Sequence, residues 1–233
     1  MLRRRRRDAG KDTRICEKGF AGGLRNRLAI RYAIQGDLRF ISHQDTLRLF
    51  ARALARAGVP VRFSKGFNPR PRLSLPLPRP LGVASRCELL VLEMDVEQDS
   101  AEVLSCLAAV MPTNIELLSA ERLGDLDRRL PREVHYSLGL DPPSCRRAEL
   151  AAAELLDQKS VLIERIDAGR GTAKKVDIRP YVLSVAIEDG TLRWAQAVTA
   201  TGTARVGEVL TALGLTSENL LHRVERQDIL YQP

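Results

Sequence analysis

The 233-residue sequence contains no apolar run longer than a few residues, so we expect no segment that spans a bilayer. Its first residues, a methionine and a leucine followed by five arginines, lack the apolar stretch of a signal peptide. The four cysteines, at positions 16, 87, 106 and 145, have spacings that suggest neither a disulfide framework nor a zinc site. These absences predict a cytoplasmic protein with reduced thiols and no membrane partner.

The motifs of several cofactor classes are also missing. No C-x-x-x-C-x-x-C occurs, so the chain lacks the ligands for the iron–sulfur cluster of a radical S-adenosylmethionine (SAM) enzyme. Neither a Walker-type phosphate loop nor G-x-G-x-x-G is found. Three histidines and scattered cysteines make a zinc site improbable. We therefore expect no cofactor and no metal in this chain.

Acidic residues are scarce in one part of the chain. Residues 25–86 contain 13 Lys or Arg and only two Asp, a net charge of +11, whereas residues 87–233 have a net charge of −8. A basic region of this kind attracts polyanions, and the attraction weakens as salt rises. A GC-rich genome also favours arginine, but it does not account for the missing acids. We therefore expect a polyanion, such as RNA, as a partner of the first third.

The apolar patterns predict an α+β protein. Residues 28–34 alternate apolar and polar, as a half-buried strand does, and Ser42 with Asp45 forms a capping box before a helix that stops at Gly58. Further strands at 59–63, 88–96 and 115–122, with a helix from 99 or 100 to about 110, complete a β-α-β-β-α-β order. A similar order follows, with an extra segment: strands at 134–140, 160–166, 182–188 and 192–199, helices at 143–158 and 205–213, and a last strand within 221–230.

The repeated order predicts two tandem ferredoxin-like halves, at 27–123 and 134–233. A linker at 124–133 joins them, and a disordered basic tail at 1–26 precedes them. The halves share no visible sequence identity, so the duplication is inferred from periodicity alone.

One segment of the first half combines a helix start, an imidazole, several cations and a loop with glycine and proline. A helix N-terminus offers free N–H groups to an anion, and His43 in its first turn is the candidate catalytic acid/base residue. Three arginines recur every four residues and form a basic stripe on one helix face. The residues expected to bind RNA or phosphate are Arg39, Ser42, Arg48, Arg52, Arg56, Lys65, Gly66, Phe67, Asn68, Arg70 and Arg72.

Each of these residues also has an ordinary structural interpretation. Ser42 and Asp45 are typical of a helix cap, and a histidine near a helix start is more often an ordinary surface residue than a catalyst. Phe67 can pack in the core, and the prolines at 69 and 71 can simply stiffen a loop. The functional interpretation rests on the concentration of these residues within the segment that has the excess positive charge.

A second polar group, formed by Lys174, Asp177 and Arg179, lies in the second half. Asp177 and Arg179 share one face if the chain is extended, so they either bind a ligand or pair with each other. Pairing is favoured, because exposed neighbouring charges usually do no more than this.

Four motifs together suggest a family. They are Gly-Asp-Leu-Arg-Phe-Ile-Ser-His-Gln-Asp at 36–45, Phe-Ser-Lys-Gly-Phe-Asn-Pro-Arg-Pro-Arg-Leu-Ser at 63–74, Lys-Lys-Val-Asp-Ile-Arg-Pro-Tyr at 174–181 and Arg-Val-Gly-Glu-Val-Leu at 205–210. Over about 28–230 the chain resembles the radical SAM-linked (radical SAM-associated) family, bacterial proteins that carry a domain of unknown function. That family usually has a histidine or Pro-Lys after the Asn-Pro, where this chain has Arg70-Pro71-Arg72. The departure weakens a two-histidine mechanism but leaves phosphate binding intact.

The resemblance implies a radical SAM enzyme as partner, because such proteins occur beside, or fused to the C-terminus of, a radical SAM protein. They are often encoded near ribonuclease G and ribosomal proteins. The first hypothesis is a non-catalytic RNA-binding accessory module that presents a structured RNA for modification. The second is a metal-independent RNA endonuclease or RNA-modifying enzyme that uses His43. The third is a subunit that binds only the radical SAM protein.

Overall fold

The computed structural model describes residues 26–167 and 172–232. The first half contains β1 (Arg27–Ile34), a short 3-10 helix η1 (Gly36–Phe40), α1 (His43–Arg56), β2 (Leu73–Ser74), β3 (Ala84–Glu93), α2 (Ser100–Ala108) and β4 (Ile115–Leu123). The second half contains β5 (Pro131–Gly139), α3 (Pro142–Asp157), β6 (Leu162–Asp167), β7 (Thr172–Asp177), η2 (Arg179–Tyr181), β8 (Val182–Glu188), β9 (Thr191–Ala197), α4 (Val206–Ala212), α5 (Ser217–Leu220), η3 (Leu221–Arg223) and β10 (Glu225–Tyr231). The basic tail predicted from the sequence lies outside the described residues, except for its last position.

The main sheet has eight strands and runs through both halves of the chain. Its order is β4-β1-β3-β10-β5-β9-β8, with the short β2 also paired to β3, while β6 and β7 form a separate two-stranded sheet. The neighbours are antiparallel except for β3 and β10, which are parallel over two residue pairs. The α+β class predicted from the sequence is confirmed, and the sheet is mostly antiparallel.

Local sequence explains the start and end of α1. The Ser42 hydroxyl accepts a hydrogen bond from the Asp45 backbone N–H at 3.1 Å, as the capping box predicts. The helix buries Phe50 and Leu54, which follow the helical period. It ends before Gly58, whose φ of +67° is readily adopted only without a Cβ.

The predicted strand at 59–63 is wrong. This segment makes only isolated bridges, from Val61 to Met94 and from Phe63 to Pro71, and the paired strand is instead β2. Pro60 has no N–H to donate, and prolines recur through the segment that follows, so a continuous ladder cannot form here.

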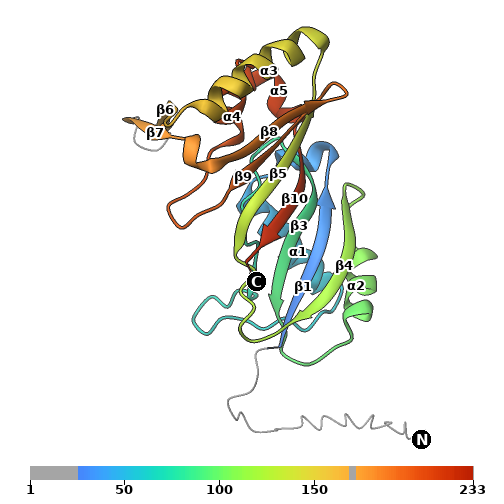
Figure 1. Ribbon diagram of the computed structural model, residues 1–233. Helices are drawn as coiled ribbons and strands as arrows, with labels where there is room; N and C mark the ends of the chain where they lie inside the picture. Colours follow the sequence, from blue (N-terminus) through green and yellow to red (C-terminus); the bar gives the residue numbers. More distant parts are fainter. Residues whose placement is uncertain (1–25, 168–171, 233) are drawn as a thin grey trace, which may run out of the picture.

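Two hydrophobic clusters fill the two halves. In the first, β1 and β3 pack against α1 and α2, with Ile30, Phe50, Leu90 and Leu107 all fully buried. In the second, α3 and α4 pack against β5 and β9, where Trp194 is buried as its alternation with apolar neighbours predicts. Figure 1 shows α3, α4 and α5 at one end of the molecule and α1 and α2 along the other half of the sheet, with β3, β10 and β5 side by side. No helix within the described ranges is both long and apolar enough to cross a membrane.

A buried ion pair lies where the halves meet. One terminal nitrogen of Arg226, on β10, donates to Glu88 on β3 at 2.8 Å, and both side chains are almost completely buried. The other donates to the carbonyl of Pro78 at 3.0 Å and to the hydroxyl of Tyr136, on β5, at 3.2 Å. Burial disfavours the charge on Arg226, but attraction to Glu88 and the interactions with Tyr136 and Cys87 together outweigh it and raise the pKa of the guanidinium. The pair therefore connects β3, β5, β10 and the loop before β3.

Replacing one partner of this pair is expected to destabilise the protein strongly. Arg226→Met leaves the Glu88 carboxylate buried without its main partner, so the free energy of unfolding should fall by about 3–5 kcal/mol. The double variant Arg226→Met/Glu88→Leu should lose much less, because no charge stays buried. Urea unfolding of both variants and the parent measures the difference.

The exposed ion pair between Arg193 and Glu188, at 3.3 Å, provides the control. Arg193→Met should change the free energy of unfolding by less than about 1 kcal/mol. The structural role assigned to Arg226 is wrong if Arg226→Met is no more destabilising than Arg193→Met.

Candidate functional site

The predicted basic stripe lies along one exposed face of α1. Arg48, Arg52 and Arg56 border a shallow groove of about 490 Å³ between α1 and the segment 110–112, which we call the α1 groove. Arg48 forms an ion pair with Asp45 at 2.8 Å, and Arg56 donates to the carbonyl of Val110 at 3.1 Å. Arg52 is exposed and makes no ion pair within the described ranges. The structure thus brings the three arginines together along one surface.

The residues at the start of α1 are engaged with each other. The Ser42 hydroxyl donates to the Asp45 carboxylate at 2.7 Å, and Arg48 donates to the same group. Both hydrogen bonds hold the pKa of Asp45 below its usual value. His43 is half-buried, and its Nδ1 is enclosed without a hydrogen-bond partner among the described residues. His43 does not border the α1 groove.

The Gly/Pro loop folds into a narrow hairpin, which we call the 62–72 hairpin. The Arg72 N–H donates to the Arg62 carbonyl at 2.7 Å, and the Ser64 N–H donates to the Arg70 carbonyl at 2.8 Å. The hairpin turns at Gly66, whose φ is +140°. Its tip exposes Lys65, Phe67, Asn68 and Arg70, and the ring of Phe67 is fully exposed rather than packed in the core.

Arg39 and Arg72 are used in internal contacts. Arg39 donates to the carbonyl of Gly36 at 2.8 Å and to that of His222 at 2.6 Å, which ties η1 to η3. Arg72 pairs with Glu93 at 3.1 Å and borders a different hollow from the α1 groove. The predicted RNA-binding residues therefore divide between the α1 groove, the 62–72 hairpin and structural contacts.

The second-half polar group bonds mainly to the backbone. The Asp177 carboxylate accepts from the N–H of Val161 at 2.8 Å, the first cause of its lowered pKa, and from the N–H of Arg179 at 3.1 Å. Arg179 donates to the carbonyls of Val182 and Leu156, at 2.8 and 2.9 Å. Lys174 is exposed on β7. Asp177 and Arg179 thus hold the chain entering β8 in place.

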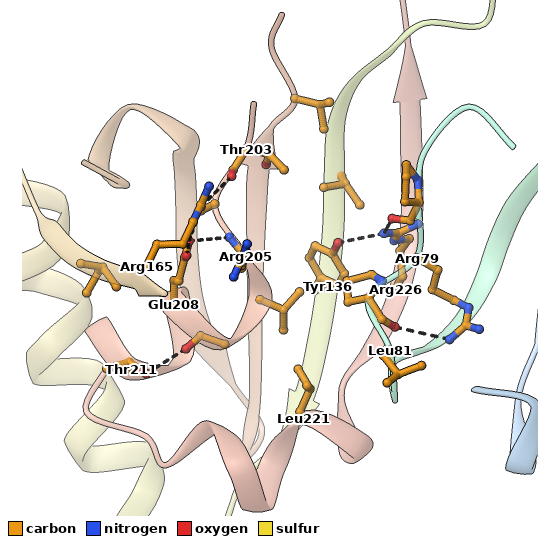
Figure 2. A pocket seen from close by; sticks show the side chains of 18 of the residues that line it. Arg79, Leu81, Tyr136, Arg165, Thr203, Arg205, Glu208, Thr211, Leu221 and Arg226 are labelled. Carbon is orange, nitrogen blue, oxygen red and sulfur yellow. Dashed lines mark hydrogen bonds and ion pairs between the residues drawn. The ribbon is translucent and has the colours of Figure 1, made fainter. Parts of the chain in front are cut away.

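An open cavity that the sequence did not indicate lies beside the buried ion pair. We call this space, about 750 Å³ in volume, the junction cavity, because the loop 77–81 of the first half and β5, β6, α4 and β10 of the second half line it. Half of its lining residues are aliphatic. Figure 2 shows two polar groups on opposite sides: Tyr136 with Arg226 on one, Arg165 with Arg205 and Glu208 on the other.

The polar group formed by Arg165, Arg205 and Glu208 is held together by a bidentate ion pair. Arg165 donates from two nitrogens to the two oxygens of Glu208, each at 2.7 Å. One of those oxygens also accepts from the Arg205 N–H at 2.8 Å. Burial raises the pKa of Glu208, but these hydrogen bonds lower it by a larger amount. The pKa of Glu208 is therefore below its usual value. The motif at 205–210 therefore shapes one end of the junction cavity.

The described cysteines are not paired with one another. Cys87, Cys106 and Cys145 are all free thiols, and burial raises the pKa of the Cys87 thiol to about 12, so it is protonated at neutral pH. No group of three or more His, Cys, Asp or Glu side chains that could hold a metal occurs in the described part of the chain.

The fold and the junction cavity define an α+β protein whose two halves share one mostly antiparallel sheet. The family model described as "Uncharacterized protein conserved in bacteria (DUF2344)" matches residues 27–209, and the chain belongs to that family. The match includes the α1 groove, the 62–72 hairpin and Glu208, but it ends before Arg226.

Solved structures give distant likenesses. An unknown protein from Galdieria sulphuraria is 16% identical, covers 89% of this chain and 99% of its own, and has a TM-score of 0.25. A microcompartments protein from Desulfitobacterium hafniense DCB is 11% identical, covers 84% of this chain and 87% of its own, and has a TM-score of 0.21. These scores are too low to support an argument about fold or function. The search of curated proteins gave no match.

Replacing Glu208 tests the ion pair at the cavity. Glu208→Gln keeps the shape of the side chain but removes the charge that holds Arg165. The free energy of unfolding at pH 7 should therefore fall by about 2 kcal/mol. Because the folded pKa is lowered, this stabilisation is present above the unfolded pKa of about 4.3 and is lost as pH falls through the folded value. Urea unfolding at several pH values should show the two proteins converging in acid.

Glu149→Gln, at an exposed position on α3, is the matched control and should have the same free energy of unfolding as the parent protein at every pH. A difference between parent and Glu208→Gln that stays constant down to pH 3 would contradict the assigned role of the charge.

Proposed function

We propose that the protein is a non-catalytic RNA-binding accessory module whose α1 groove binds the RNA backbone. The observation that carries the proposal is the row of Arg48, Arg52 and Arg56 along one exposed groove, which one acidic residue, Asp45, also lines by pairing with Arg48. Successive members of the row lie about 6 Å apart along the helix axis, since a helix rises about 1.5 Å per residue. A row of cations at this spacing favours a chain of phosphates over an isolated anion.

The 62–72 hairpin supplies a second contact of different chemistry. Phe67 is a fully exposed aromatic ring beside Lys65 and Arg70, and an exposed ring of this size has no packing role in the described structure. Aromatic rings beside cations bind unpaired bases by stacking. The RNA expected from these two contacts has both a regular backbone and an unpaired base, as a stem-loop does.

We interpret the architecture as two ferredoxin-like units that share a sheet. In the first half, β4, β1 and β3 are neighbours and β2 lies on β3; in the second, the order is β10-β5-β9-β8. These strand orders support the interpretation, with β6 and β7 as the extra segment. The arrangement leaves the basic groove on the first half and a separate surface on the second.

The proposed partner is a radical SAM enzyme, which the motifs at 36–45, 63–74, 174–181 and 205–210 support by resemblance. In this proposal the partner performs the modification, and this chain contributes no cofactor. The half-buried position of His43, with Nδ1 turned away from solvent, favours a binding role over acid/base catalysis by this chain.

Charge reversal in the α1 groove should weaken RNA binding. For Arg48→Glu/Arg52→Glu we expect at least a tenfold loss of affinity for a fluorescein-labelled RNA stem-loop at low salt, measured by anisotropy. The slope of log affinity against log salt should become shallower by about 1.5 to 2, since two phosphate contacts are lost. Arg132→Glu/Arg146→Glu has the same change of charge at exposed second-half positions and should weaken binding much less.

Equal losses in the two double variants would indicate a general effect of net charge and would contradict the assignment to the groove. If the parent protein does not bind the stem-loop but copurifies with the radical SAM enzyme, the protein-only hypothesis replaces the proposal. Cleavage of the stem-loop in EDTA that His43→Ala abolishes would instead favour the endonuclease.

Removing the exposed ring of the hairpin should affect unpaired bases selectively. Phe67→Ala is expected to lower affinity for the stem-loop by about 1–3 kcal/mol while leaving affinity for a blunt RNA duplex nearly unchanged. Leu126→Ala removes another fully exposed apolar side chain, outside the hairpin, and serves as the control. Equal affinity of the parent and Phe67→Ala for the stem-loop would remove the hairpin from the interface.

A further inference from the structure

The junction cavity has the size and lining of a small-molecule site. Its volume of about 750 Å³ lies within the range of about 300–1,000 Å³ that such sites occupy. Half of the lining residues are aliphatic, and polar groups lie at its two ends. The aliphatic residues are Leu77, Pro78, Pro80, Leu81, Val134, Ile163, Val198, Ala204, Val206 and Leu221.

One polar atom in the wall is buried without a partner. Arg226 is 1% exposed, and its terminal nitrogens bind Glu88, Pro78 and Tyr136, but its Nε has no hydrogen-bond partner among the described residues. A buried N–H of a charged group that lacks an acceptor costs free energy. The guanidinium of Arg226, a residue that lines this end of the cavity, is therefore short of one acceptor.

Each end of the cavity has an arginine without a carboxylate in contact. At one end Arg226 binds the carboxylate of Glu88, while Arg79 donates to backbone carbonyls such as those of Arg39 and Val83. Burial lowers the pKa of Arg79, as expected for a cation without a carboxylate in contact. The field at this end favours an anion.

The opposite end has equal numbers of cations and carboxylates. Arg165 is bound to Glu208, while Arg205 lines the cavity next to them with an exposed side chain and only its backbone N–H bonded to that carboxylate. Glu164 also borders the cavity and, like Arg205, is exposed. The guanidinium of Arg205 makes no ion pair among the described residues, so it is free to meet an anion.

We propose that the junction cavity binds a small organic anion with an apolar body. The aliphatic part of the wall takes up the body, and Arg79 or Arg205, neither of which has a carboxylate in contact, takes up the anionic group. The junction cavity shares no lining residue with the α1 groove, so the two sites are separate. Because both halves line it, the ligand contacts the first and second halves at once.

Two fluorescent probes of nearly the same shape test this. 1-Anilinonaphthalene-8-sulfonate is an apolar anion, and N-phenyl-1-naphthylamine is its neutral counterpart. The folded protein should bind the anion with one saturable site and at least tenfold more tightly than the neutral probe. Fluorescence titration measures both affinities.

Two exposed lining residues provide variants that should leave the fold intact. Arg205→Glu should weaken binding of the anion about fivefold or more and leave the neutral probe unaffected. Thr211→Phe places a ring at the cavity wall and should lower the affinity for both probes. Arg146→Glu, an exposed change of the same charge on α3, should alter neither. Near-ultraviolet circular dichroism of each variant confirms that the fold is retained.

The proposal is overturned if the two probes bind equally, if binding does not saturate at one site, or if Arg205→Glu and Arg146→Glu weaken the anion to the same extent. It is also overturned if Thr211→Phe binds both probes as the parent does, because the probes then occupy another surface. None of these outcomes depends on RNA binding, so this inference and the proposed function fail separately.

Discussion

The ion pair between Arg226 and Glu88 is the contact on which the joining of the two halves depends. Removing two charges from water is costly, and the pair offsets that cost only because Tyr136 and the Pro78 carbonyl bind the same guanidinium. The parallel pairing of β3 and β10 itself spans only two residue pairs. A short ladder and a well-bonded buried charge together hold β3, β10 and β5 in one sheet, and they also form one wall of the junction cavity.

Elements with a strong local pattern could be predicted from the sequence. The boundaries of α1 follow from Ser42, Asp45 and Gly58, and the alternation of β1 follows from its side chains. The insertion of β10 between β3 and β5 could not be predicted, because nothing in 225–231 specifies which edge it joins. The short β2 was missed for a related reason: its pairing with β3 is set by tertiary contacts in a proline-rich segment.

Of the candidate sites, too, one could be predicted from the sequence and one could not. The arginines of α1 are four residues apart, so their common face could be read from the sequence. The junction cavity could not, because its polar groups come from β5, β6, β10, α4 and a loop that are distant in the chain. One signal was present: Glu88 stands within an apolar run between Cys87 and Leu89, where a charge requires a buried partner. The identity of that partner depends on the tertiary fold.

The central position of β10 has a consequence for synthesis on the ribosome. This strand is translated after every other described element, yet it completes the middle of the sheet. Until it emerges, part of one edge of β3 and one edge of β5 have unpaired N–H and C=O groups, which can pair with strands of other chains. Nascent chains that stall before residue 225 are therefore exposed to edge-to-edge association, and they also lack the guanidinium that neutralises Glu88.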